Sequence, residues 1–153
     1  MMDLERTLVI LKPDAVQRGL IGEVLARYEK RGLRIAAMKL EWLARETVEQ
    51  HYAAHRDKPF FTPTVEYMTS GPVVVLILEG PDAIAVTRLV NGATNSAEAA
   101  PGTIRGDFAL TIGRNVVHAS DKQETADAEI ALYFGDRGIV EYSRGVENWI
   151  YVK

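Results

Sequence analysis

His118 is one of three histidines in the chain, and it ends a short apolar run in the sequence G-R-N-V-V-H-A-S-D. An imidazole in this position suits three roles: a packed core residue, a metal ligand or a nucleophile. On a helical wheel of residues 122–134, Glu129 falls beside Ala126, on the side that faces the core. A carboxylate removed from water needs a partner, and His118 and Ser120 are the nearest candidates.

A pair formed by His118 and Glu129 would define what the imidazole can do. A carboxylate bonded to one ring nitrogen fixes the tautomer and leaves the other nitrogen with a defined role. Such a pair suits either a supported metal ligand or a nucleophile with its orienting group. The metal interpretation is the weaker one, because His51 and His55 lie far from His118 in sequence. These residues alone favour a packed core histidine with a solvated glutamate.

Phosphate binding would depend on individual cationic side chains, because the chain has no G-x-x-x-x-G-K-[ST] loop. Four cationic residues lie at a predicted strand end, in a helix or in loops: Lys12, Arg88, Arg105 and Arg114. A lone cation is far more often a surface charge than a ligand, so their convergence is a hypothesis. Phe60 and Phe61 lie between two prolines and either fill the core or stack on a base, and for Phe61 the core is favoured.

The strands that must position these residues are read from apolar runs. The predicted strands are residues 7–11, 35–43, 73–78 and 115–118. The first and third are apolar on both faces, which is typical of strands covered on both sides. The second alternates, with Met38, Leu40 and Trp42 on its apolar face, and predicts a half-buried strand.

Helical spacing appears between these strands. The predicted helices are residues 21–31, 45–52, 82–90 and 122–134. Residues 59–63 carry two prolines and interrupt the second helix, and residues 91–106 form a long loop rich in small residues. The order of strands and helices predicts an α+β sandwich of the split βαβ type, an antiparallel sheet with helices on one face.

Composition describes one ordinary globular domain, residues 1–153. Hydrophobic residues make up 47% and charged residues 25%, and the formal net charge is -3. This charge, with no basic stripe, argues against a nucleic-acid-binding module. The chain has no cysteine, which excludes disulfides and thiolate metal sites. An acidic start and no long apolar stretch predict a cytoplasmic protein without a membrane segment.

Several segments of the chain resemble the nucleoside diphosphate kinase family. Residues 115–121 (NVVHASD) are similar to that family's N-x-x-H-G-S-D signature. Four further segments match in order and spacing: residues 7–35, 51–61, 71–84 and 92–109. Together they extend from about residue 6 to residue 134, and long matches in register outweigh the packed-histidine interpretation.

The resemblance implies a ferredoxin-like βαββαβ core, a four-stranded antiparallel sheet with helices packed on it, and a ping-pong phosphotransferase. A nucleoside triphosphate, typically ATP, would give its γ-phosphate to Nδ1 of His118, and a nucleoside diphosphate of any base or sugar would receive it. Glu129 and Ser120 match the residues that hold the imidazole. Magnesium is implied as the cofactor, held mainly by the nucleotide phosphates and water.

The resemblance also implies how the other site residues divide their tasks. Those next to the phosphates and the sugar are Lys12, Tyr52 and Asn115. Those that grip the phosphates are Arg88, Thr94 and Arg105. Those that enclose the base are Phe60 and Ile112. Ala119 and Ser96 depart from the pattern, which usually has Gly and Pro there, so strain at the first and a looser loop at the second are expected.

Family members form homo-oligomers, and the tail that extends to Trp149 resembles the hexameric forms more than the tetrameric ones. The main rival interpretation is a catalytically silent member kept for interactions. Such members lose the nucleophile or the phosphate grip, whereas this chain has every matched position.

Overall fold

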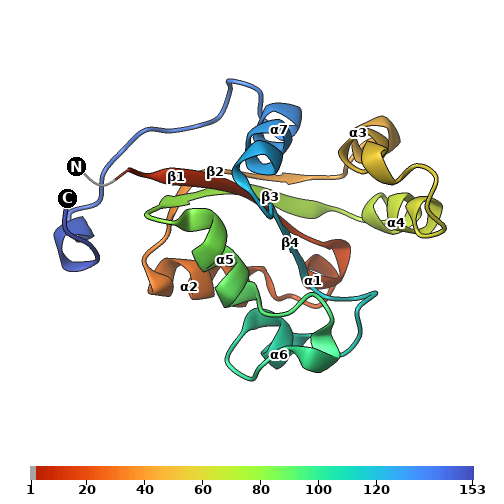
Figure 1. Ribbon diagram of the computed structural model, residues 1–153, viewed down its shortest axis with the longest axis horizontal. Coiled ribbons are helices and arrows are strands. Elements are labelled where there is room, and N and C mark those ends of the chain that lie inside the picture. Colours follow the sequence, from red (N-terminus) through yellow and green to blue (C-terminus); the bar gives the residue numbers. More distant parts are fainter. Residues whose placement is uncertain (1–2) are drawn as a thin grey trace.

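The two continuous apolar runs of the sequence become the inner strands of one antiparallel sheet. The structure is a computed structural model that describes residues 3–153, and within them four strands pair in the order β2-β3-β1-β4 (Figure 1). The strands are β1 (Glu5–Leu11), β2 (Arg34–Glu41), β3 (Val73–Gly80) and β4 (Val117–Ala119). The expected α+β, ferredoxin-like sheet is therefore confirmed, with β4 paired to the central strand β1.

Helices cover both faces of this sheet, so the expectation of helices on one face was wrong (Figure 1). Packed on one face are α1 (Pro13–Gln17), α2 (Ile21–Arg31), α5 (Ala83–Asn91) and α6 (Ile104–Phe108). Packed on the other are α3 (Arg45–His51), α4 (Phe61–Met68) and α7 (Gln123–Tyr133). The reason lies in β1, where Val9 and Leu11 face one core while Leu8 and Ile10 face the other.

The edge strand β2 is exposed on the face that was expected to be buried. Met38, Leu40 and Trp42 are 53%, 66% and 64% exposed. The opposite face of β2 is the one turned toward a helix, because the ammonium of Lys39 donates to the backbone carbonyl of Tyr133 at the end of α7. Within residues 3–153, Met38 and Leu40 of β2 therefore lie mostly open to solvent.

Short helices occupy stretches that the sequence left as loops. They are α1, α6 and the 3-10 helices Ala53–His55, Ser96–Glu98 and Glu147–Trp149. Pro63 lies in the first turn of α4, where the missing N–H costs no hydrogen bond, so this proline does not break the helix. Ser96 donates to the carbonyl of Thr111 at 3.1 Å, which ties down the loop that was expected to be loose.

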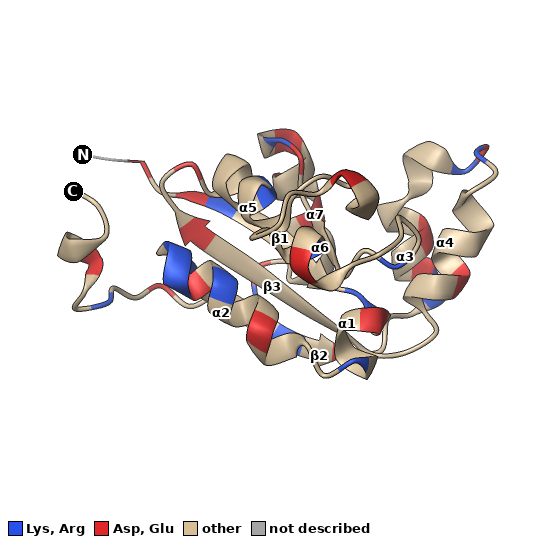
Figure 2. Ribbon diagram, turned by 90° about the horizontal axis from the view of Figure 1, so that it is seen from below, with Lys and Arg blue, Asp and Glu red and all other residues tan. Residues whose placement is uncertain are grey.

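Basic and acidic residues are interspersed on the side of the molecule that α2 covers (Figure 2). No helix within residues 3–153 is both long and apolar enough to cross a membrane.

Candidate active site

His118 lies at the middle of β4, where the sheet edge meets the buried side of α7. Its Nε2 is 2.9 Å from Oε1 of Glu129, and the hydroxyl of Ser120 donates to the same oxygen at 2.7 Å. Glu129 is 7% exposed, whereas the His118 side chain is 19% exposed. The inward position of Glu129 on the helical wheel is thus borne out, and the carboxylate has the two partners that the sequence proposed.

The surroundings keep the glutamate ionised and the histidine neutral. Burial alone would raise the pKa of Glu129, but hydrogen bonds and charge from His118 and His51 lower it far below its usual range. Burial lowers the pKa of His118, and the repulsion of His51 and Lys12 adds to this, against the attraction of Glu129. A neutral imidazole has a free lone pair, which a nucleophile requires.

The proton positions follow from the carboxylate. Because Nε2 of His118 faces an ionised oxygen, Nε2 carries the ring hydrogen and donates it. Nδ1 is then the unprotonated nitrogen, and it makes no hydrogen bond to any residue between 3 and 153. Nδ1 is therefore the ring nitrogen whose lone pair is free.

His51 is a site residue that the sequence analysis missed. Its side chain is only 3% exposed, and its Nε2 is 3.2 Å from the second oxygen of Glu129. Its ring meets that of His118 edge to face, with centroids 4.7 Å apart. The distance along the chain hid this contact, because α3 ends at His51 directly beside α7 only after folding. A histidine near the end of a predicted helix, next to the matched Tyr52, was the signal available in the sequence.

The backbone is strained two residues before His118. Val116 has a φ of 74°, which is rare for a β-branched residue and costs on the order of 1–3 kcal/mol. A tight turn holds it there, since the N–H of Val117 donates to the carbonyl of Asn115 at 2.8 Å. Ala119 has no positive φ, so the expected cost of its Cβ does not arise.

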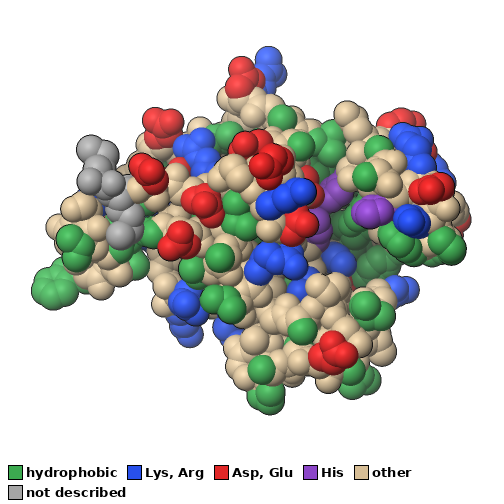
Figure 3. Space-filling model, viewed as in Figure 1, with side chains coloured by type: hydrophobic (Ala, Val, Ile, Leu, Met, Phe, Trp, Pro, Cys, Tyr) green, Lys and Arg blue, Asp and Glu red, His purple; other side chains and the backbone are tan. Residues whose placement is uncertain are grey.

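Two adjoining cavities lead from His118 to the surface. The one at His118 has a volume of about 650 Å³ and is lined in part by Arg88, Thr94 and Asp121. A smaller one of about 210 Å³ lies between Phe60 and Ile112. Tyr52 lines both cavities. Figure 3 shows the histidines in a hollow of the surface with Lys and Arg side chains beside it.

The smaller cavity has the features of a site for a flat ring. Phe60 and Ile112 are half exposed or more, as side chains that await a partner would be. Arg114 lies in the same lining, and its guanidinium carbon is 4.0 Å from the ring centre of Tyr67. The sequence hypothesis that Phe60 offers an aromatic face is thus compatible with its exposure.

Lys12 and Asn115 form a polar pair beside these cavities. The ammonium of Lys12 donates to Oδ1 of Asn115 at 2.8 Å, and the amide of Asn115 donates to the carbonyl of Thr94 at 3.0 Å. Burial, and then the charge of Arg105, lower the pKa of Lys12 to about 8, against the opposing charge of Asp14. A desolvated cation of this kind interacts strongly with an anion that enters the site.

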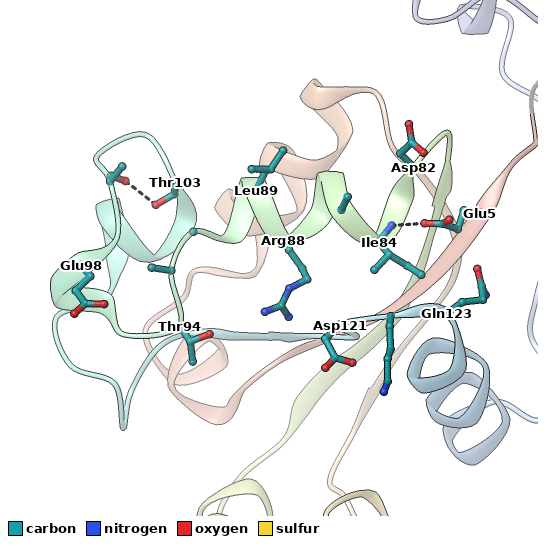
Figure 4. A pocket seen from close by; sticks show the side chains of 15 residues that line it. Glu5, Asp82, Ile84, Arg88, Leu89, Thr94, Glu98, Thr103, Asp121 and Gln123 are labelled. Atoms are coloured by element: carbon teal, nitrogen blue, oxygen red, sulfur yellow. Dashed lines mark hydrogen bonds between the residues drawn. The ribbon is translucent and has the colours of Figure 1, made fainter.

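Arg88 and Arg105 are placed differently. Arg88 extends from α5 toward the gap between Thr94 and Asp121 (Figure 4), where it also lines a neighbouring apolar cavity of about 930 Å³. Arg105 is buried and donates to three backbone carbonyls, those of Gly92, Asn115 and Val117. The structure thus gives Arg105 a role in holding the strained turn, and it lines neither cavity of the site.

One group of possible metal ligands occurs within residues 3–153, formed by His51, His118 and Glu129, whose ligand atoms lie within 4.8 Å of one another. Two of its three donors are nitrogens, whereas Mg²⁺ prefers oxygen ligands. Both histidines already bond to Glu129 through their Nε2 atoms. The cluster therefore does not fit magnesium, which agrees with a cation that arrives on phosphate oxygens.

Known proteins similar to this chain share one family name. A family model described as nucleoside diphosphate kinase matches residues 5–139. The nucleoside diphosphate kinase of Archaeoglobus fulgidus is 60% identical over 148 residues, which are 97% of this chain and 98% of that protein. The nucleoside diphosphate kinase of Thermomicrobium roseum is 56% identical over 147 residues, which are 96% of this chain and 99% of that protein.

A solved structure with the same fold contains a nucleotide. It is a halophilic nucleoside diphosphate kinase from Halobacterium salinarum in complex with CDP, with a TM-score of 0.95, 44% identity and coverage of 98% of this chain and 100% of that chain. Because the family model matches most of the sequence and the relatives align over nearly their full length, the chain belongs to the nucleoside diphosphate kinase family.

Proposed function

We propose that this enzyme transfers the γ-phosphoryl group of a nucleoside triphosphate to a nucleoside diphosphate through a phosphohistidine on His118. The observation that carries the proposal is the split between the two ring nitrogens. Nε2 is held by Glu129, while Nδ1 has no hydrogen-bond partner among residues 3–153, on a ring that lines the larger of the two cavities. Every position that the sequence resemblance required is present.

The first half-reaction needs no proton transfer at the ring. The Nδ1 lone pair attacks the γ-phosphorus, the bond from phosphorus to the β-γ bridging oxygen breaks, and the nucleoside diphosphate leaves. The phosphorylated ring carries positive charge, which Glu129 stabilises from the Nε2 side. The second half-reaction is the reverse, with a terminal oxygen of another diphosphate as the attacking atom. Catalysis is then mostly positioning and charge neutralisation.

The nucleotide would extend from His118 to the surface through the two cavities. Phosphates would lie near Arg88, Thr94 and Lys12, with Arg105 acting through its nearby charge and through the turn that it holds. Lys12, Asn115 and Tyr52 would contact the sugar or the phosphates next to it. The base would stack on Phe60, with Ile112 on its other side. Stacking accepts any base, which supports broad specificity.

Tyr52 would act as a hydrogen-bond donor in this arrangement. Burial, and then the charge of Glu129, raise the pKa of Tyr52 well above its usual value, so the phenol keeps its proton. The Halobacterium salinarum relative is in complex with CDP, which supports a nucleotide as the ligand of this chain.

Magnesium belongs to the proposal as a cation carried by the nucleotide phosphates. When bound there, it neutralises phosphate charge and orients the terminal phosphoryl group. The protein would add to this charge neutralisation through cationic side chains that line the larger of the two cavities, among them Arg88 and Lys122.

We extend the proposal to a single-domain subunit, residues 1–153, that works as a homo-oligomer in the cytoplasm, with a hexamer favoured over a tetramer. The support for assembly is the exposed apolar side chains of Met38 and Leu40 on the edge strand β2, together with Trp149 and Val152 in the tail, which are 89% and 83% exposed. The support for a hexamer is the similarity of the tail to the hexameric forms.

Incubation with γ-labelled ATP and magnesium tests the proposed function. The enzyme should become labelled, and the label should be lost in acid and kept in base, as expected of a phosphohistidine. His118→Ala should abolish the label and keep the fold, whereas label that persists in this variant would refute the assignment. A wild-type protein that takes no label would be a silent member of the family.

A further inference from the structure

His51 is a buried histidine whose two ring nitrogens are both engaged by one helix. Nε2 is 3.2 Å from Oε2 of Glu129, and Nδ1 is 2.6 Å from the hydroxyl oxygen of Tyr133. Glu129 and Tyr133 are four residues apart on α7, so they lie on the same face of the helix, one turn apart. The imidazole at the end of α3 is thus held at two points by α7.

The protons in this group follow from the charges. Glu129 is ionised, so Nε2 of His51 must carry a hydrogen and donate it. Nδ1 of the same ring is then an acceptor, and the donor is the phenol of Tyr133. Burial, followed by the charges of Tyr52, Glu129 and Glu41, raises the pKa of Tyr133 far above its usual value, so this phenol keeps its proton. Tyr133 therefore fixes the tautomer of His51.

Both oxygens of the Glu129 carboxylate therefore accept hydrogen bonds. One oxygen accepts from His118 and Ser120, and the other accepts from His51. Without His51 the carboxylate could turn about its last bond, and the oxygen that faces Nε2 of His118 would no longer be fixed. The His51 ring itself has little freedom, because it stacks on Tyr52 with centroids 4.4 Å apart and meets the His118 ring at 4.7 Å.

We propose that His51 is a positioning residue for phosphoryl transfer, held in its active tautomer by Tyr133. It holds Oε2 of Glu129, so that Oε1 stays on the Nε2 hydrogen of His118 while Nδ1 attacks and then carries the phosphoryl group. This inference rests on the proposed function. It predicts an effect on the chemical step, because His51 lies behind the carboxylate while Arg88 and Lys12 meet the phosphates.

Two substitutions at the same site separate the hydrogen bond from the packing. In His51→Gln the amide nitrogen reaches about the place of Nε2 and can still donate to Glu129. In His51→Asn the shorter amide reaches only about the place of Nδ1, so the donation is lost. Tyr133→Phe keeps the aromatic ring and removes the hydroxyl that sets the tautomer. Its matched control is Tyr142→Phe, which removes a phenol donor bonded at 2.6 Å to the carbonyl of Ile35.

The measurement is the single-turnover rate of enzyme phosphorylation at saturating MgATP, together with the ATP concentration that gives half the maximal rate. His51→Asn should slow the maximal rate about tenfold or more, the kinetic equivalent of losing a hydrogen bond to a charged group. His51→Gln should keep most of the wild-type maximal rate. The maximal rate of Tyr133→Phe should lie between those of His51→Asn and His51→Gln. Tyr142→Phe should match the wild type, and the half-saturating ATP concentration should stay nearly constant throughout.

Equal rates in His51→Asn and His51→Gln, or an effect confined to the half-saturating concentration, would overturn the role of His51. If thermal unfolding shows that His51→Asn does not fold, the comparison of Tyr133→Phe with Tyr142→Phe decides, and equal rates in that pair overturn the proposal. Failure of the proposed function is a separate result, because the wild type would then carry no label that depends on His118.

Discussion

At the scale of single residues, the site depends on one carboxylate that serves three donors. Glu129 accepts hydrogen bonds from Ser120, His118 and His51, and together these hold it ionised in a buried position. A buried carboxylate is costly unless paired, so the network offsets the cost of burying Glu129 and, in the proposed mechanism, orients the ring of His118.

Glu129→Gln tests the charge on this group. The amide keeps one acceptor oxygen but places an NH₂ against one of the two imidazole donors, and it removes the charge that stabilises a phosphorylated ring. We expect the protein to fold and the phosphorylation of His118 to slow by about tenfold or more in rapid-quench measurements. A rate equal to that of the wild type would make the carboxylate merely structural.

The titration of Lys12 should make phosphorylation of the free enzyme by MgATP slower at alkaline pH. Burial and the charge of Arg105 lower its pKa to about 8, so the ammonium is charged below that pH and neutral above it. Attraction for a triphosphate is therefore present at low pH and is lost as pH rises through about 8. The second-order rate constant for phosphorylation by MgATP should decline over that range. Lys12→Arg stays charged and should lack this decline, whatever its absolute rate, and a decline unchanged in this variant would assign it to another group.

At the scale of elements, the sequence gives good predictions where one pattern decides the outcome. The inner strands, the amphipathic helices and the inward position of Glu129 all follow from local periodicity. The sequence could not show that β2 turns Leu40 outward, because that depends on where α7 packs. Nor could it show His51 beside Glu129 or the positive φ of Val116, since long-range packing enforces both.

The loop before α6 is tightly packed, and Gly106 gives a test of this. A Cβ at Gly106 would lie 1.9 Å from the carbonyl oxygen of Ala100, a backbone atom that cannot move without moving the loop. Gly106→Ala should lower the free energy of unfolding by about 1–3 kcal/mol in chemical denaturation. Gly22→Ala is the control, because that helical position has open space and alanine favours helix. Equal stability of the two variants would show that the loop at Ala100 shifts at little cost to make room for the added Cβ.

At the scale of the whole molecule, the exposed apolar side chains of β2 are the feature that supports the proposed homo-oligomer. Leu40→Glu places a charge among these side chains and should shift the protein to a smaller assembly in native mass spectrometry or analytical ultracentrifugation. Lys30→Glu, on the exposed side of α2, changes charge without removing apolar surface and should leave the assembly as it is. A wild-type protein that is monomeric at micromolar concentration would contradict the proposed homo-oligomer.

The central claim is that a phosphoryl group rests on Nδ1 of His118 between two nucleotides. The most direct measurement isolates the enzyme after reaction with MgATP, removes all nucleotide, and then adds a single nucleoside diphosphate that differs in base from ATP. The isolated enzyme should carry one phosphoryl group on that nitrogen and should pass it to the added diphosphate without any ATP present. A product that forms only while both nucleotides are present, with no phosphorylated enzyme between them, would rule out the phosphohistidine.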